Sequence, residues 1–161
     1  NADLKESDKV LVYGASGSVG SYAVQLAKQV YDAEVTGICS TRNLELVRSI
    51  GADHVIDYTQ QDLQEHGITY DVVFDAVGKL TASEVKTLLN ENGTFLTVRK
   101  PTRETVENLS ALKSLFEAEK LKPVIDRSFL LEEIVEAHRY VESGRKRGNV
   151  VVPVTERGGL L

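Results

Sequence analysis

The stretch Val10-Leu-Val-Tyr-Gly-Ala-Ser-Gly-Ser-Val-Gly20 decides the fold of this chain. A short apolar run ends at Tyr13, glycines follow at positions 14, 17 and 20, and an amphipathic run opens at Ser21. A strand, a glycine turn and a helix N-terminus in this order can hold the pyrophosphate of a dinucleotide. The reason is that glycine lets a phosphate approach the backbone, and the first N–H groups of the helix face the anion. Three glycines alone equally suit an ordinary turn, so the flanking runs are what favour the nucleotide interpretation.

Short apolar runs alternate with amphipathic segments outward from this turn. The runs predict strands at 10–13, 34–40, 54–58, 70–77 and 94–98. Periodic apolar positions predict helices at 21–31, 42–50, 62–66 and 81–90, the last stopped by Asn92-Gly93 in a left-handed conformation. This alternation predicts an α/β fold: a doubly wound parallel sheet flanked by helices.

The pattern changes after Val98. A basic join at 99–103 leads to a predicted helix at 104–120, with apolar residues on one face: Val106, Leu109, Leu112, Leu115 and Phe116. A strand at 123–129, a helix at 131–143 and a strand at 148–154 follow, and 155–161 is expected to be a tail.

The end of the second strand determines the type of dinucleotide. An acidic residue about 20 positions after the glycines would bond both ribose hydroxyls of NAD. Ser40 falls 20 residues after Gly20, and no acid occurs before Glu45. Ser40 and Arg42 instead suit the 2′-phosphate of NADP. The alternative is that Ser40 or Thr41 caps a helix and Arg42 is simply solvated.

Two further residues at strand ends have open roles. Asp75 either bonds a ribose or the nicotinamide side of the cofactor, or caps the turn at Gly78. Tyr58 either covers the adenosine phosphate or edges the sheet.

Composition limits the class of protein. The net charge of −5 argues against general affinity for nucleic acid or anionic membranes, although a local basic pocket is compatible with it. The single cysteine, Cys39, rules out a disulfide framework within these residues and favours a reducing compartment, the cytoplasm. No apolar run reaches the roughly 20 residues of a membrane span. The lack of a Met and of a lead-in before the first strand suggests a portion of a longer chain.

Several catalytic chemistries lack their residues. None of the tyrosines is followed four positions later by lysine, as a short-chain dehydrogenase requires. Cys39, His54, His66 and His138 fall on separate predicted elements without metal-ligand spacing, so no metal site and no catalytic residue is assigned. A methyltransferase on a similar sheet is disfavoured, because an acid is expected at the end of its second strand.

With these motifs in place, the chain resembles the medium-chain dehydrogenase/reductase family, in its zinc-independent quinone oxidoreductase branch. Besides the glycine stretch, the phrases that carry the resemblance are Ala23-Val-Gln-Leu-Ala-Lys28, Gly51-Ala-Asp-His-Val-Ile-Asp-Tyr58, Tyr70-Asp-Val-Val-Phe-Asp-Ala-Val-Gly78, Leu121-Lys-Pro-Val-Ile-Asp-Arg127, Glu136-Ala-His-Arg-Tyr-Val141 and Gly148-Asn-Val-Val-Val152.

The resemblance implies an NADPH-binding Rossmann domain from an enzyme that reduces quinones or activated double bonds. Its expected cofactor-binding residues are Ser16, Gly17, Ser18 and Val19 at the pyrophosphate, Ser40, Arg42, Asn43 and Tyr58 at the 2′-phosphate, and Asp75, Val77 and Gly78 near the ribose and nicotinamide.

The chain departs from the family pattern in ways that bear on function. The family has a catalytic domain before the Rossmann domain, which these residues lack, and a helix and sixth strand where Val98 here runs almost directly into Pro101. Ser18 stands where the family often has a second consecutive glycine. We expect a Rossmann domain at 1–120, shortened near 100–101, and a strand–helix–strand segment of the catalytic domain at 121–154. In this family the missing strand forms the edge of the sheet at which two subunits pair. The resemblance therefore implies a homodimer for the parent protein and not for this chain.

The missing domain supplies one wall of the family's active-site cleft, so this chain alone is expected to be inactive. The alternative is a dinucleotide-binding module or sensor without turnover.

Overall fold

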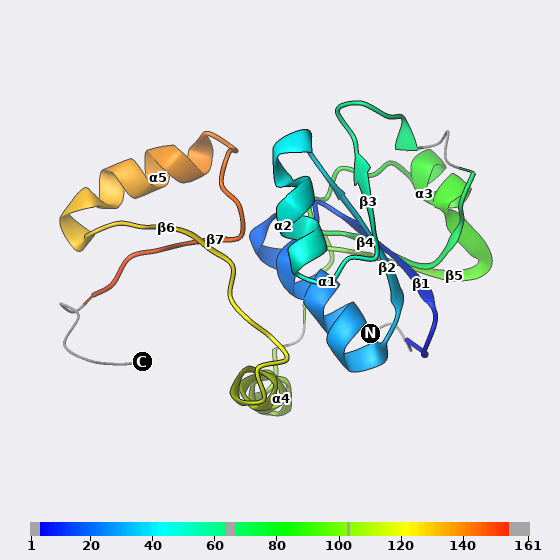
Figure 1. The fold of residues 1–161 in the computed structure, drawn as a ribbon, viewed down its shortest axis with the longest axis horizontal. Helices are drawn as coiled ribbons and strands as arrows, with labels where there is room; N and C mark the ends of the chain where they lie inside the picture. Colours follow the sequence, from blue (N-terminus) through cyan, green and yellow to red (C-terminus); the bar gives the residue numbers. More distant parts are fainter. Residues whose placement is uncertain (1–3, 64–66, 103, 155–161) are drawn as a thin grey trace.

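The computed structural model describes residues 4–63, 67–102 and 104–154. Its centre is a five-stranded parallel sheet in the order β3-β2-β1-β4-β5 (Figure 1). The strands are β1 (Lys9–Tyr13), β2 (Glu34–Cys39), β3 (His54–Asp57), β4 (Tyr70–Asp75) and β5 (Leu89–Thr97). The chain winds outward from β1 to β3 and then crosses over to β4, which confirms the predicted doubly wound sheet.

Helices cover both faces of this sheet. On one face, α1 (Ser18–Tyr31) and α2 (Leu44–Ser49) bury Val24 and Val47 against Val10 and Val12 of β1. On the other face, α3 (Ala82–Leu88) contributes to a cluster around Leu11, the residue between those two valines. Since β1 is buried on both faces, its apolar run is continuous rather than alternating.

The boundary between α3 and β5 differs from the prediction. The helix begins with a capping box between Thr81 and Glu84, but it ends at Leu88 rather than Asn90. Leu89 is extended and pairs with Tyr70, and Gly93 lies within β5 without a positive φ. The predicted left-handed stop at Asn92-Gly93 is therefore wrong. The reason is that pairing with β4, through a register shift after Tyr70, extends the strand across these turn-forming residues.

Smaller differences occur at other element ends. Helix α1 begins at Ser18 rather than at position 21, and α2 is preceded by a short 3₁₀ turn, η1 (Thr41–Asn43). The predicted helix at 62–66 falls largely outside the described residues.

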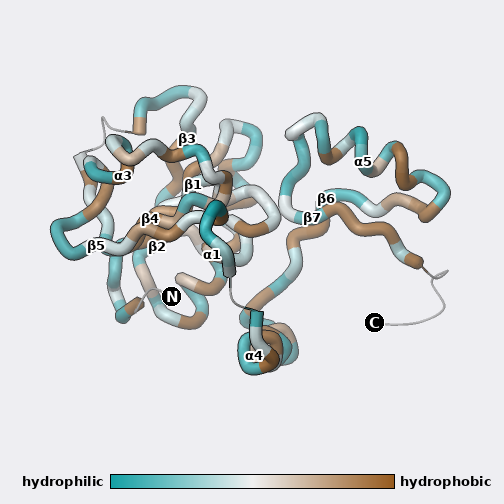
Figure 2. The backbone as a smooth tube through the Cα atoms, turned by 180° about the vertical axis from the view of Figure 1, so that it is seen from behind, coloured by the Kyte–Doolittle hydropathy of each residue, from teal (hydrophilic) through white to brown (hydrophobic). Residues whose placement is uncertain are grey.

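The C-terminal part forms a separate strand–helix–strand unit, as predicted. Strands β6 (Ile125–Ser128) and β7 (Asn149–Val151) pair in parallel around η3 (Leu131–Glu133) and α5 (Ile134–Glu142). Figures 1 and 2 show this unit beside the larger sheet. Helix α4 (Val106–Glu117) connects the two in the sequence and lies apart from both sheets.

The apolar face of α4 is not part of the core. The helix contains no buried residue, and Val106 and Leu109 are largely exposed. Phe116 contacts Tyr22 of α1 edge-on, with ring centroids 6.2 Å apart. The predicted helix at 104–120 is thus confirmed with shorter bounds, and its apolar face is largely exposed.

No helix among the described residues combines the length and hydropathy that crossing a membrane requires. The predicted tail at 155–161 lies outside those residues.

Candidate functional site

The glycine turn lies at the carboxyl edge of the sheet, between β1 and α1. Gly14 has a φ of +81°, and the Gly17 amide donates to the Gly14 carbonyl at 3.0 Å. A Cβ on Gly20 would lie 2.1 Å from the Gly14 oxygen, so this glycine is needed for α1 to pack against the turn. Gly17 has no side chain to cap α1, and the first turn contains no acidic residue. The start of α1 is thus suited to an external anion.

The loop after β2 is tied to this turn by Asn43. Its side chain is 4% exposed, and its Nδ2 donates to Ser16 Oγ at 3.0 Å and to Ser40 Oγ at 3.3 Å. The buried Asn43 amide therefore links the loop after β2 to the glycine turn. Its Oδ1 has no hydrogen-bond partner among the described residues.

A buried carboxylate fixes the neighbouring threonine. Thr41 Oγ1 donates to Asp57 Oδ2 at 2.5 Å, and both the amide and the hydroxyl of Thr59 donate to Oδ1. The hydrogen bond from Thr41, opposed by burial and aided by Thr59, lowers the pKa of Asp57. Tyr58 comes directly after β3, the outer strand of the sheet, and is 54% exposed, which is compatible with both of its predicted roles.

Asp75 closes the turn after β4. The carboxylate is 1% exposed and accepts hydrogen bonds from the amides of Val77 at 3.0 Å, Gly78 at 2.7 Å and Leu80 at 2.9 Å. Of its two predicted roles, this geometry favours turn capping. The Val77 side chain lies against Gly14, since a Cβ built there would be 2.3 Å from Val77 Cγ2. The end of β4 therefore adjoins the glycine turn.

The C-terminal unit reaches the same turn, a contact that the sequence pattern did not predict. Gly148 pairs with Gly17 in a parallel bridge, and its amide donates to the Ser16 carbonyl at 2.8 Å. Ser18 Oγ donates to the Gly148 carbonyl at 2.8 Å, and Lys146 Nζ donates to Ser18 Oγ at 2.6 Å. The only sequence signal was the basic run before Gly148, residues 145–147.

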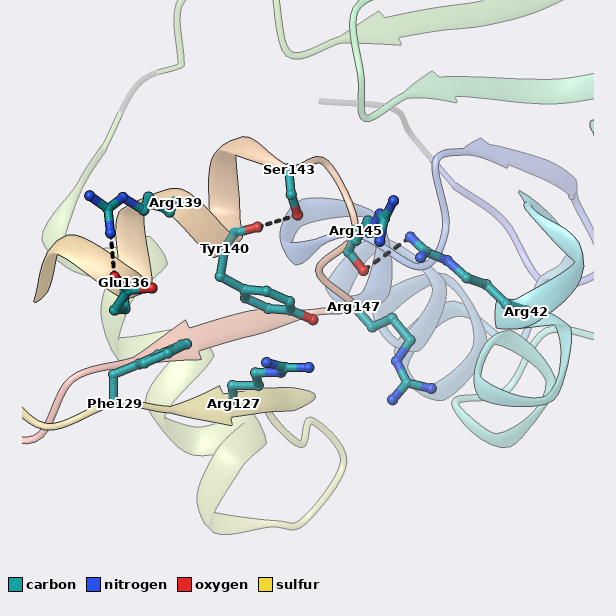
Figure 3. Close-up of a pocket in the computed structure, with 9 residues that line it drawn as sticks. All are labelled: Arg42, Arg127, Phe129, Glu136, Arg139, Tyr140, Ser143, Arg145 and Arg147. Carbon is teal, nitrogen blue, oxygen red and sulfur yellow. Dashed lines mark hydrogen bonds and ion pairs between the residues drawn. The ribbon is translucent and has the colours of Figure 1, made fainter. Parts of the chain in front are cut away.

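A cleft of about 580 Å³ opens between this C-terminal unit and the loop after β2 (Figure 3). Cationic and aromatic side chains dominate its lining: Arg42, Arg127, Phe129, Glu136, Arg139, Tyr140, Ser143, Arg145 and Arg147. At its sheet-side end, Arg42 Nη2 donates to the Arg145 carbonyl at 3.0 Å. Two of the five arginines are paired, Arg139 with Glu136 and Arg147 with Asp126. The other three leave the site with a net positive charge that favours anions.

Asp126 organises the wall of this cleft. Its side chain is 4% exposed and accepts from Tyr140 Oη at 2.5 Å and from the Arg147 amide at 3.0 Å. Burial alone would raise the pKa of Asp126, but these hydrogen bonds and the Arg147 guanidinium bring the pKa below its usual value. Arg127 stacks on the Tyr140 ring, 4.1 Å from its centroid.

The described residues contain no group of three His, Cys, Asp or Glu side chains placed to share a metal ion. Cys39 is buried, and this burial, together with the charge of Asp57, raises the pKa of its thiol to about 11. The Cys39 thiol therefore stays protonated near neutral pH.

Comparison with known proteins places these features in a family. A family model described as zinc-binding dehydrogenase matches residues 18–128. The chain is 35% identical over 163 residues to a 2-methylene-furan-3-one reductase of Solanum lycopersicum, covering 94% of the chain and 42% of that protein. It is 36% identical over 162 residues to a chloroplastic NADPH-dependent alkenal/one oxidoreductase of Arabidopsis thaliana, covering 93% of the chain and 42% of that protein.

A solved quinone oxidoreductase from Coxiella burnetii has the same fold, with a TM-score of 0.80 and 28% identity over 96% of this chain and 55% of the other. The chain thus spans less than half the length of the two curated relatives.

Proposed function

This chain belongs to the zinc-binding dehydrogenase family, and from that membership we propose that it is the NADPH-binding portion of an oxidoreductase that transfers hydride to a quinone or an activated double bond. The observation that carries the proposal is the glycine turn at the carboxyl edge of the sheet, where α1 starts without a side-chain cap. Parallel sheets of this kind bind their ligands at that edge.

The pyrophosphate of the cofactor would be held by Ser16, Gly17, Ser18 and Val19. These residues bring backbone N–H groups and the positive end of the α1 dipole to one place. The close packing of Gly20 against the Gly14 backbone supports this role, because it fixes the position of the turn relative to the start of α1.

The preference for NADPH over NADH rests on the loop after β2. Ser40 and Arg42 lie there without an acidic residue, and Asn43 holds the Ser40 hydroxyl in place. Arg145 adds a second cation next to Arg42. An arginine can bind a phosphate through two parallel hydrogen bonds, which the ribose hydroxyl of NADH does not offer. The printed name of the Arabidopsis relative, an NADPH-dependent enzyme, agrees with this preference.

The end of β4 would border the ribose and nicotinamide. Asp75 fixes the backbone of Val77 and Gly78, and the partly exposed Val77 side chain would face the cofactor beside Gly14. The nicotinamide ring, when bound, supplies the hydride. The described residues would bind and orient the cofactor, and we assign none of them as a proton donor.

The resemblance supports further proposals. We propose that residues 1–120 form the cofactor domain and 121–154 belong to the catalytic domain of a zinc-independent, cytoplasmic parent that pairs as a homodimer. The Arabidopsis relative, by its name, is chloroplastic, so its compartment differs. We also propose that the 161-residue chain is inactive by itself, and the alternative is a non-catalytic dinucleotide-binding module or sensor.

Fluorescence titration of the chain with NADPH and NADH tests the binding role. We expect saturable binding with NADPH at least about tenfold tighter, the value of one charge-assisted hydrogen bond. Binding of neither nucleotide would overturn the proposal. NADPH oxidation, with a quinone or an enone as acceptor, then separates an enzyme from a sensor when it is measured on the full-length parent.

A further inference from the structure

Lys146 occupies an electrostatically unfavourable position beside the glycine turn. Its half-buried ammonium group donates to Ser18 Oγ at 2.6 Å and to the Gly148 carbonyl at 2.9 Å. Ser18 is the first residue of the 14-residue helix α1. A helix N-terminus carries partial positive charge and disfavours a neighbouring cation. Within the described ranges, no carboxylate oxygen lies within the 4.0 Å of Lys146 Nζ that would make an ion pair.

In the part of the chain that the structure describes, the ammonium group of Lys146 is matched by hydrogen bonds but not by an opposite charge. A partly desolvated cation is costly when no anion balances it. A polyanion at the start of α1 would compensate the ammonium group and the helix dipole together.

The position of Lys146 is set by the C-terminal unit. The bridge between Gly17 and Gly148 fixes this segment along the turn. The Ser18 hydroxyl donates to the Gly148 carbonyl, so its lone pairs face the lysine, which donates to it. Lys146 is thus held over the first turn of α1 by contacts that leave an N–H of its ammonium group available.

We propose that Lys146 is a ligand of the cofactor's diphosphate, supplied to the glycine turn by the C-terminal unit. This assignment rests on the proposed function and adds a side chain from the other end of the sequence. It implies a linkage: a bound diphosphate contacts both segments and therefore stabilises the docking of residues 145–148 on 16–18, and docking strengthens cofactor binding equally. The diphosphate is common to NADPH and NADH, so Lys146 contributes to both, unlike Arg42.

The test compares Lys146→Gln and Lys146→Arg with Lys86→Gln, a control on an exposed lysine of α3. Titrations with NADPH and NADH should show that Lys146→Gln weakens both by about tenfold or more, which is typical of a lost charge-assisted hydrogen bond. Lys146→Arg should keep most of the affinity, and Lys86→Gln should match the unmutated chain.

Two titration outcomes would overturn the assignment. Equal affinities for Lys146→Gln and Lys86→Gln would remove Lys146 from the site. Weaker binding of NADPH alone would place Lys146 at the 2′-phosphate instead. If the unmutated chain binds neither nucleotide, the proposed function itself fails.

A measurement on the unmutated chain avoids any folding defect of the variants. Acetic anhydride should acetylate Lys146 more slowly when NADPH is present, while the acetylation of Lys86 stays unchanged, as read by mass spectrometry. Unchanged acetylation of Lys146 at saturating NADPH would contradict the proposal.

Discussion

Gly148 forms a parallel β-bridge with Gly17 and so places the C-terminal unit against the turn that precedes α1. Gly148 is also held tightly within the C-terminal segment, because a Cβ there would lie 2.3 Å from the Val124 carbonyl oxygen and the residue has a φ of +59°. The glycine turn and the C-terminal unit are therefore in direct contact.

We expect Gly148→Ala to destabilise the chain and to weaken NADPH binding. The control is Gly144→Ala, at a φ of +68° with no atom within 4 Å of a built Cβ, so that it carries only the left-handed backbone cost of about 1–2 kcal/mol. The steric clash should make Gly148→Ala worse by about a further 1–3 kcal/mol. Urea unfolding of both variants measures the difference, and equal losses would contradict the tight contact between Gly148 and Val124.

The charge of Arg42 should discriminate between the two nucleotides. Arg42→Glu is expected to weaken NADPH about 10- to 100-fold, because an attractive contact with the 2′-phosphate becomes repulsive, and to change NADH by less than about threefold. Arg48→Glu, on an exposed arginine of α2, serves as the control. Fluorescence titration gives the constants, and equal losses for both nucleotides would remove Arg42 from the phosphate site.

Asp75→Asn tests whether this carboxylate supports the backbone. The carboxylate accepts three amide hydrogen bonds, and an asparagine side chain replaces one of its acceptor oxygens with a donor. We expect the free energy of unfolding to fall by about 1–3 kcal/mol. Asp32→Asn is the matched control, since Asp32 is 75% exposed and has a φ of +50° that Asn tolerates. A stability equal to that of the control, with weaker cofactor binding, would restore the ribose role.

Asp126 should make the C-terminal unit sensitive to acid. Its hydrogen bonds lower its pKa in the folded state, so the ionised form is favoured by folding. The resulting stability is complete above the ordinary carboxyl pKa of about 4 and is lost as the pH falls through the lower native value. Below pH 4, the unmutated chain should therefore lose stability more steeply than Asp126→Asn. At pH 7 we expect this variant to be weaker by about 1–3 kcal/mol. Thermal unfolding across pH 2–7 measures both effects, and parallel pH profiles would contradict them.

Much of the sheet and of the glycine turn could be predicted because their signals are local. Continuous apolar runs identify β1 and β4, and the spacing of Gly14, Gly17 and Gly20 identifies the turn, since each depends on residues adjacent in the sequence. The end of α3 was predicted wrongly. The turn-like residues Asn92-Gly93 lie within β5 because this strand pairs with β4, which is distant in the sequence.

The sequence by itself determined the parallel sheet, the glycine turn and the absence of an acid after β2, because backbone conformation and residue chemistry at these points follow from neighbours in the chain. Only the tertiary structure decided that Asp75 caps its own turn, that Asn43 joins two loops, and that Lys146 and Gly148 lie against Ser18 and Gly17. Those contacts depend on where distant segments meet, and a one-dimensional pattern of hydrophobicity and turns carries no information about that meeting point.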